Sequence, residues 1–149
     1  MYLNPKKALL CANAFAAATG RCGNSIKWTL DDSGNLTLSG SGEMWNYGYD
    51  TSPFKDYEIR KATIEDGITS IGDGDCSDLS KITSLAEIPP VCGSGVFDRV
   101  NKTNCELIVP KGSVAAYKQA DVWNEFSSIR GFSGVEVTVA GKTRKIVVE

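Results

Sequence analysis

The acidic residues of the segment GDGDCSD are the strongest local candidates for chemistry in a chain that contains no histidine. Without histidine, the commonest general base, the commonest metal ligand and the usual partner of a nucleophilic Ser or Cys are all missing. Asp73, Asp75 and Asp78 cluster here, but a calcium loop needs oxygen ligands in a defined order with a closing glutamate, and that order is not present. Solvated acids in a tight turn are the favoured interpretation, so no metal or cofactor is expected.

Cysteine chemistry is equally poorly supported. The five cysteines are odd in number, irregularly spaced and without a C-x-x-C motif: Cys11, Cys22, Cys76, Cys92 and Cys105. Cys76 and Cys105 precede apolar stretches and are expected to pack as small hydrophobes. Cys92 lies in PPVCGSG, which lacks the G-K-[ST] of a phosphate loop, and no histidine is available to form a thiolate. Cys11 and Cys22 would be able to pair in an exported chain. We therefore predict a protein that is not an enzyme.

Composition limits the remaining classes of protein. With 149 residues, 42% apolar residues and 23% charged residues, the chain is long enough for one globular domain. The net charge is −2 and no basic face is indicated, so no nucleic acid is expected as a partner. The longest apolar run, Ala8–Ala18, is interrupted by Asn13 and is too short to span a bilayer. Residues 1–21, with Lys6 and Lys7 before that run, read either as a signal peptide or as an N-terminal helix.

The middle of the chain organises the rest. From Ala62 to Ile88, small or apolar residues recur at gaps that are neither two nor three to four, which indicates a chain that turns repeatedly and sends a side chain inward at each turn. Cys105–Pro110 (CELIVP) continues the pattern. The stretches that begin at Ala62, Ile82 and Leu107 are about 20 to 25 residues apart, within the leucine-rich range. We predict that they are the rungs of a short solenoid.

Three further segments flank this middle part, and the first two are expected to close its ends. Ser25–Ser39 alternates apolar and polar residues around DDSGN and is predicted to be a β-hairpin. Gly112–Asp121 has helical spacing of its apolar residues and is predicted to be a short helix. Val135–Glu149 is predicted to be a last hairpin, with its turn at 140–142.

The loop-rich segment between the hairpin and the first rung is rich in aromatic residues. Trp45, Tyr47 and Tyr49 are interpreted as a platform for a sugar ring, or, in the favoured alternative, Trp45 joins Phe54 and Tyr57 in a plug that closes the core.

Two segments carry a resemblance to a known family. CGNSIKWTLDDSGNLTLSGSGEMWNY resembles the N-terminal cap of BspA-like leucine-rich repeat proteins, and KATIEDGITSIGDGDCSDLSKI resembles their repeat. Ile71 and Gly72 match the I-G of that repeat, and Cys76 and Leu79 match its Cys and Leu. The Ala-Phe pair of the repeat is absent, and the loop GDGDC is about three residues short. The stretch from Leu79 to Phe132 is similar to a final repeat and C-terminal cap, with Phe97 at the core aromatic position.

This resemblance covers residues 22–132 and implies an architecture. The fold class is expected to be α/β: a short leucine-rich-repeat-like solenoid with a β-hairpin N-terminal cap and a small helical C-terminal cap, followed by a C-terminal β-hairpin over residues 133–149. It also implies a bacterial protein that is secreted or lies on the cell surface and adheres to a host or bacterial surface protein. A monomer without a transmembrane span is expected.

Partner binding is predicted on polar residues of the rungs, because these would project from the sheet: Lys61, Thr63, Glu65, Lys81, Thr83 and Glu106. A solvated face without a partner is the equally weighted alternative. Three other hypotheses remain open at this stage. They are a carbohydrate-binding module that uses the aromatic loop 44–57, an enzyme with paired carboxylates such as Asp73 and Asp75, and a truncated relic with no partner.

Overall fold

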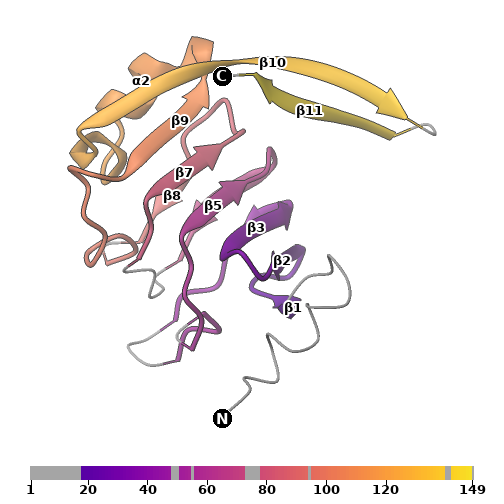
Figure 1. The fold of residues 1–149 in the computed structure, drawn as a ribbon, viewed down its shortest axis with the longest axis vertical. Helices are drawn as coiled ribbons and strands as arrows, with labels where there is room; N and C mark the ends of the chain where they lie inside the picture. Colours follow the sequence, from indigo (N-terminus) through magenta and orange to yellow (C-terminus); the bar gives the residue numbers. More distant parts are fainter. Residues whose placement is uncertain are drawn as a thin grey trace.

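The computed structural model describes residues 18–47, 51–54, 56–72, 78–93, 95–139 and 142–148, with residues 133–139 and 142–148 described by their backbone. Most strands belong to one eight-stranded main sheet (Figure 1). In spatial order its strands are β1 (Ala18–Arg21), β2 (Ile26–Leu30), β3 (Asn35–Gly40), β5 (Lys61–Ile64), β7 (Lys81–Ser84), β9 (Glu106–Pro110), β10 (Ser128–Val139) and β11 (Lys142–Val148). A smaller sheet contains β4 (Gly42–Glu43), β6 (Ile68–Ile71) and β8 (Val91–Cys92).

The β2–β3 hairpin confirms the hairpin predicted at 25–39. Its strands are antiparallel, with Thr29 opposite Thr37. The Asp31 carboxylate accepts hydrogen bonds from the backbone N–H groups of Ser33 (2.8 Å) and Asn35 (3.0 Å), which closes the turn. Gly34 adopts a φ of 82°, a conformation that glycine reaches without steric cost. The turn chemistry in the sequence therefore determines this hairpin locally.

The N-terminal segment extends the same sheet. Residues 18–21, the last part of the segment interpreted as a signal peptide or helix, form strand β1, which pairs antiparallel with β2. Gly20 faces the Trp28 indole so closely that an added Cβ would lie 2.8 Å from the ring nitrogen. The rest of the predicted segment, residues 1–17, lies outside the described residues.

The middle of the main sheet is parallel. Strands β3, β5, β7, β9 and β10 run in the same direction, and β5, β7 and β9 contain the three predicted rungs at residues 62, 82 and 107. The connections from β5 to β7 and from β7 to β9 carry β6 and β8, which pair parallel to each other in the smaller sheet. The connection from β3 to β5 carries β4, which pairs parallel with β6, so the chain visits the smaller sheet three times before it reaches β9.

The solenoid predicted from the sequence is not confirmed, because the described structure is a sheet-rich domain with one short α-helix. A solenoid repeats one coil along its length. Here the connections from β3 to β5, from β5 to β7 and from β7 to β9 carry the short strands β4, β6 and β8, whereas the next connection, from β9 to β10, carries α2 (Val114–Gln119). At the two ends of the main sheet, β1 with β2 and β11 with β10 are antiparallel, so no coil is propagated.

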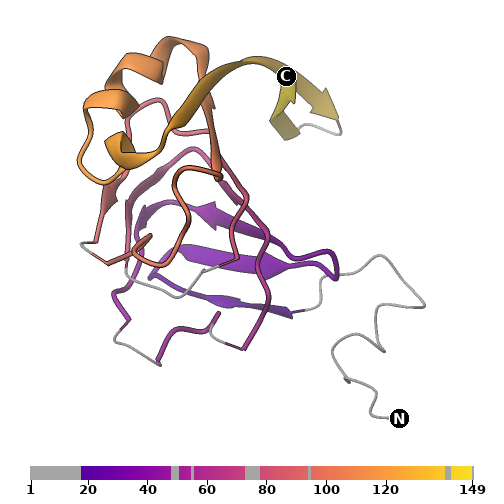
Figure 2. The same ribbon diagram turned by 60° about the vertical axis from the view of Figure 1, so that its left-hand side comes forward.

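Helical turns close one end of the core. The 3₁₀ turn η1 (Lys111–Ser113), helix α2 and the 3₁₀ turn η2 (Trp123–Glu125) lie at this end (Figure 2). The helix predicted at 112–121 corresponds to η1 and α2 together, which begin at Lys111 and end at Gln119. Their aromatic residues form a buried cluster: Phe97 and Tyr117 each contact Trp123, with ring centroids 5.3 and 5.2 Å apart, and Phe126 lies 5.4 Å from Phe97. The aromatic cluster replaces a further strand layer at this end.

The C-terminal hairpin predicted at 135–149 is present, but its first strand starts earlier. Strand β10 begins at Ser128, pairs parallel with β9 through Phe132, and then continues to pair antiparallel with β11. Figure 2 shows β10 curving away from the body of the domain before β11 returns along it.

Candidate functional site

The strands of the main sheet send alternate side chains to opposite faces, as the two-residue period of a strand requires. Ile64 on β5, Ile82 on β7 and Leu107 on β9 are buried in the core. Their neighbours Lys61, Thr63, Lys81, Thr83 and Glu106 have the opposite parity along these strands and are half-buried or exposed. These residues therefore share the outer face of the sheet, which is the candidate site.

Five threonines form one row across the outer face. The strand registers place Thr19 opposite Thr29, Thr29 opposite Thr37, Thr37 opposite Thr63, and Thr63 opposite Thr83. We call these five residues the threonine row. Neighbouring strands in a sheet lie about 4.8 Å apart, so the row presents a methyl and a hydroxyl group at that interval. Thr29 is exposed, and Thr37, Thr63 and Thr83 are half-buried.

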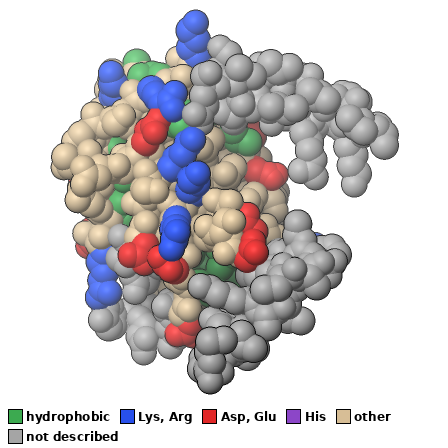
Figure 3. Space-filling model, in the orientation of Figure 1, with side chains coloured by type: hydrophobic (Ala, Val, Ile, Leu, Met, Phe, Trp, Pro, Cys, Tyr) green, Lys and Arg blue, Asp and Glu red, His purple; other side chains and the backbone are tan. Residues whose placement is uncertain are grey.

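A second row lies beside the threonine row on strands β3, β5, β7 and β9. Asn35 is opposite Lys61, Lys61 is opposite Lys81, and Lys81 is opposite Glu106. We call these four residues the charged row. The Arg130 guanidinium on β10 donates a hydrogen bond to the Glu106 carboxylate and forms an ion pair with it. Figure 3 shows Lys and Arg side chains in a column over the middle of this face, with Asp and Glu on either side.

The structure thus brings together five of the six predicted rung residues. Lys61, Lys81 and Glu106 are in the charged row, and Thr63 and Thr83 are in the threonine row. The sixth, Glu65, directly follows β5 and is half-buried, and its backbone N–H donates to the Leu38 carbonyl (3.0 Å). It therefore lies at the end of the strand, one step beyond the two rows.

Sequence reasoning missed five residues of this surface, namely Thr19, Thr29, Asn35, Thr37 and Arg130. Thr29 and Thr37 alternate with the apolar residues of the predicted hairpin, so their outward orientation was available from the sequence. Their position beside Thr63 was not, because it depends on the parallel pairing of β3 with β5, which joins residues far apart in the chain.

The predicted aromatic platform is only partly described. Trp45 is 44% exposed, whereas Tyr47 is half-buried against the core, and this burial raises its pKa. Tyr49 lies outside the described residues. Phe54 and Tyr57 pack on Trp28, with ring centroids 5.4 and 6.1 Å away, as the plug interpretation requires. Trp45 does not share that burial, so its assignment to the plug is wrong.

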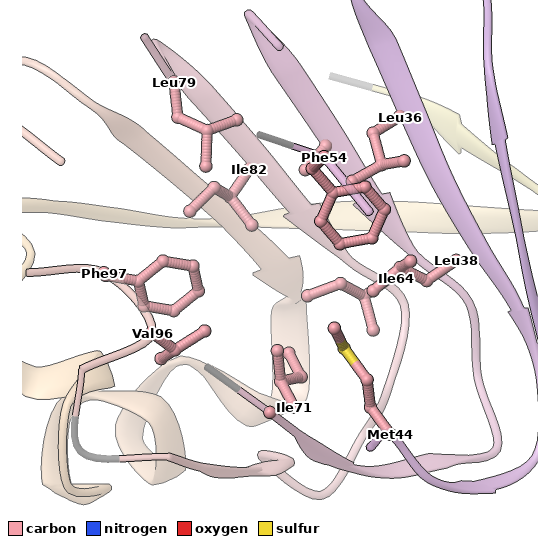
Figure 4. A pocket seen from close by; sticks show the side chains of 12 residues that line it. Leu36, Leu38, Met44, Phe54, Ile64, Ile71, Leu79, Ile82, Val96 and Phe97 are labelled. Carbon is pink, nitrogen blue, oxygen red and sulfur yellow. The ribbon is translucent and has the colours of Figure 1, made fainter. Parts of the chain in front are cut away.

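An apolar cavity lies between the two sheets. Its volume is about 40 Å³, and its lining is wholly apolar. Figure 4 shows side chains from both layers around it, including Ile64 and Ile82 from the main sheet and Ile71 from β6. Gly72 and Leu79 also line it, beside the segment where the resemblance leaves the core aromatic missing. A cavity this small with an apolar lining is a packing gap, since cavities that hold benzene are about 150 Å³.

The thiols of the described residues are poor nucleophiles. Burial raises the pKa of Cys22 to about 11, that of Cys105 to about 11 and that of Cys92 to about 12. A protonated thiol is neither a good nucleophile nor a metal ligand. Within the part of the chain that the structure describes, no three Cys, Asp or Glu side chains gather as a metal site would require. Asp73, Asp75 and Cys76 lie outside those residues.

The comparisons with known proteins add one likeness. No known protein family and no curated protein matches the sequence. Among solved structures, the chain is similar to a leucine-rich repeat protein from Eubacterium ventriosum ATCC 27560, with 24% sequence identity and a TM-score of 0.45. The match covers 76% of this chain and 26% of that protein's chain.

None of the helices that the structure describes is long and apolar enough to cross a bilayer.

Proposed function

We propose that this chain is a non-catalytic binding module of BspA-like leucine-rich repeat type, secreted or displayed on a bacterial surface, which adheres to host or bacterial surface proteins. The observation that supports the proposal best is the outer face of the main sheet. Its two rows of polar side chains stand in register on neighbouring strands, whereas the opposite face of the same strands is buried in the core.

This face has the rigidity that recognition requires. Side chains on paired strands are held more precisely than side chains on loops, so a partner meets groups at fixed positions. Lys61 is exposed, and Lys81, Thr63 and Thr83 keep part of their surface accessible to solvent. A monomer offers this face once, so we expect one partner site per chain.

The aromatic loop supports a second candidate, carbohydrate binding. This candidate is supported by the exposure of the Trp45 side chain, which is 44% accessible to solvent. The Trp45 backbone is held in place, because its carbonyl is in close contact with Gly72. An exposed indole is a common stacking surface for a flat ligand. With Tyr47 half-buried, this candidate depends on a single described ring.

The test is binding of the full chain to an immobilised panel of matrix proteins, mucins and neutral glycans. The test variant combines Lys61→Ala, Thr63→Ala and Lys81→Ala. The matched control combines Lys111→Ala, Thr69→Ala and Lys118→Ala, exposed positions away from the main sheet's outer face. We expect saturable binding to a protein, lost in the test variant and kept in the control.

Other outcomes of this experiment contradict the proposal. Binding that Trp45→Ala abolishes and the triple variant preserves would move the site to the aromatic loop. Absence of binding from a cooperatively folded sample would leave a structural or assembly role, and a broad, non-cooperative melt would favour a relic without a partner.

A further inference from the structure

We propose that the free edge of strand β1 accepts an extended segment of a partner protein as an added strand, whose side chain opposite Gly20 supplies a hydrogen-bond acceptor to the Trp28 indole. The inference rests on the proposed function only for the class of partner, a protein, and adds where and in what conformation the partner is held. Strand β1 carries Thr19, the first residue of the threonine row, so this edge borders the outer face and belongs to the same partner site.

The first support is the unpaired edge of the main sheet. Strand β1 stands at one end of the spatial order of that sheet and pairs with β2 alone among the described strands (Figure 1). The Cys22 N–H donates to the Ile26 carbonyl (3.1 Å), and hydrogen-bonded pairs alternate along an antiparallel ladder. The backbone groups of Gly20 therefore point to β2, whereas those of Thr19 and Arg21 point away from it and bond to no described residue. Each of these two residues offers an N–H donor and a carbonyl acceptor to a further strand.

The second support is a buried hydrogen-bond donor at this edge. Trp28 on β2 is 6% exposed, and its Nε1 is buried without an acceptor among the described residues. Gly20 lies opposite Trp28, and a Cβ built on Gly20 would be 2.8 Å from Nε1, so the polar side of the indole lies over β1. Buried donors are nearly always paired, because an unmade hydrogen bond leaves the full cost of removing the group from water. An acceptor that arrives beside Gly20 removes that cost.

An added strand places a side chain where this donor can use it. Trp28 and Gly20 have the core-facing parity, and a residue paired with Gly20 on a further strand shares that parity and lies about 5 Å away. Gly20 has no side chain to separate the two, so a short acceptor such as asparagine spans the gap when the indole turns towards the edge. One extended segment thus satisfies the backbone groups of β1 and the indole together.

The third support is the charge at this edge. Arg21 on β1 and Lys27 on β2 are exposed and directly opposite each other on the outer face. The Arg21 guanidinium donates to the neutral Asn24 carbonyl, and neither Arg21 nor Lys27 forms an ion pair with a described carboxylate. Like charges directly opposite each other destabilise a sheet, so an acidic residue beside Arg21 would relieve their repulsion. The partner segment is therefore expected to carry Asp or Glu next to the acceptor.

The same observations argue against a second copy of this chain as the occupant. A second β1 strand would bring Ala18 or Gly20 to the core-facing side, and neither side chain accepts a hydrogen bond from the indole. It would also bring a second Arg21 to an edge that is already positively charged. A partner of different sequence fits both features.

The test follows binding of a short blocked peptide, Thr-Val-Glu-Asn-Glu-Val-Thr, to the isotope-labelled full chain by NMR. In an extended strand the asparagine and valines of this peptide share one face, and the glutamates lie on the other. We expect saturable binding that shifts the indole N–H signal of Trp28. The signal of Trp123, which donates to the Pro90 carbonyl, should stay in place. The variants Trp28→Phe and Trp45→Phe assign the three indole signals.

Changes in the peptide test its chemistry. A peptide with valine in place of the asparagine keeps the extended shape and loses the acceptor, so it should bind about tenfold more weakly. A peptide with lysine in place of both glutamates should also bind more weakly, because it adds positive charge beside Arg21.

A pair of variants of the chain tests the edge itself. Thr19→Pro removes an outward N–H and leaves the β1–β2 ladder intact, since a strand tolerates proline where its N–H faces solvent. Thr19→Val is the matched comparison, because it also loses the hydroxyl bonded to the Trp28 carbonyl but keeps the N–H. The proline variant should bind the peptide at least about tenfold more weakly than the valine variant. Melting temperatures of both variants, measured beside the native chain, exclude unfolding as the cause.

Each contrary result has a distinct meaning. A Trp28 signal that does not move, or equal affinities of Thr19→Pro and Thr19→Val, would overturn the inference. A dimer that Thr19→Pro dissociates, without peptide binding, would assign the edge to a second copy and also overturn it. If the peptide does not bind while a panel protein binds and is lost in the triple variant, this inference fails and the proposed function stands. Peptide binding with the Trp28 shift but without panel binding would support the edge site and overturn the adhesive function.

Discussion

At the scale of single residues, three side chains of the helical end satisfy backbone carbonyls between β7 and β8. The Tyr117 hydroxyl donates to the Ala86 carbonyl (2.7 Å), Ser113 Oγ donates to the Glu87 carbonyl (2.7 Å) and Trp123 Nε1 donates to the Pro90 carbonyl (2.8 Å). Carbonyls of a sheet-like segment are normally paired by the next strand. Here side chains replace that strand, so these residues stabilise the end of the domain.

Replacement of Tyr117 by Phe should therefore destabilise the fold. Tyr117 is fully buried, and its hydroxyl also lies 2.7 Å from Ser84 Oγ, so the change leaves two buried polar groups with fewer partners. We expect the free energy of unfolding, measured by urea denaturation, to fall by about 1–3 kcal/mol. Tyr47→Phe is the control, because the Tyr47 hydroxyl has no hydrogen bond in the described structure. Equal effects of the two changes would contradict the role given to Tyr117.

The buried thiols predict a dependence of stability on pH. Burial raises the pKa of Cys22 from 9.0 to about 11, so the folded chain keeps a proton that the unfolded chain loses above pH 9.0. The contribution of the thiol to stability is therefore complete below pH 9.0 and falls as the pH rises towards 11. Cys105 shifts in the same direction.

Urea denaturation under reducing conditions, repeated from neutral pH to pH 10, measures this effect. The free energy of unfolding of the native chain should decline more steeply above pH 9.0 than that of Cys22→Ala. Lysine titration affects both proteins alike and cancels in the comparison. Identical slopes would show that Cys22 does not control this pH dependence.

At the scale of elements, the strands of the smaller sheet are held together by close backbone contacts around β4 and β6. A Cβ placed on Gly72, which follows β6, would lie 2.1 Å from the Trp45 carbonyl oxygen. That distance leaves no room for a side chain, and the contacting atom is backbone, which has little freedom to move. The glycine allows the segment after β4 to lie against the end of β6.

Gly72→Ala should consequently force these segments apart. We expect a loss of about 1–3 kcal/mol in the free energy of unfolding, the usual cost of overpacking. Gly112→Ala provides the matched control, since a Cβ there meets nothing within 4 Å and the change should stay within about 0.5 kcal/mol. A tolerated Gly72→Ala, read by urea denaturation, would mean that β4 and β6 are not in close contact.

At the scale of the whole molecule, the domain consists of two unequal layers with a core that is not completely filled. The main sheet has eight strands and the smaller sheet three, and the cavity of about 40 Å³ lies where they face each other. Half of the lining residues are fixed in strands of the two sheets, which limits how far the core can collapse onto the gap. A larger side chain that fills this volume should therefore stabilise the fold.

The Ala62→Val variant tests whether filling the cavity stabilises the fold. Ala62 lines the cavity from β5, and valine adds two methyl groups of a branched shape that strands favour. We expect the free energy of unfolding to rise by about 1 kcal/mol, given about 0.8 kcal/mol for each buried carbon group. Ala62→Ser, which is similar in size but polar, should instead lower it. Destabilisation by valine would show that the cavity is closed to the Ala62 side chain.

Local patterns in the sequence were sufficient to predict much of the secondary structure. The hairpin at 25–39, the strands at 62, 82 and 107, the helix after Gly112 and the C-terminal hairpin each depend on alternation or turn residues within a short window. The outward parity of Lys61, Thr63, Lys81 and Thr83 follows from the same alternation. The segment at 18–21 could not be assigned in this way, because it becomes a strand only by pairing with β2.

The sequence by itself thus determined the strands of the β2–β3 hairpin with its turn, the strands at residues 62, 82 and 107, and their buried and solvent-facing residues. Only the tertiary structure decided how the strands are ordered, that the domain is two layers without a solenoid, and that Thr37 lies beside Thr63. The physical reason is how far apart in the sequence the interacting residues are. Alternation and turns are set by neighbouring residues, whereas register, layer closure and the contact of Gly72 with Trp45 depend on packing between segments that are distant in the chain.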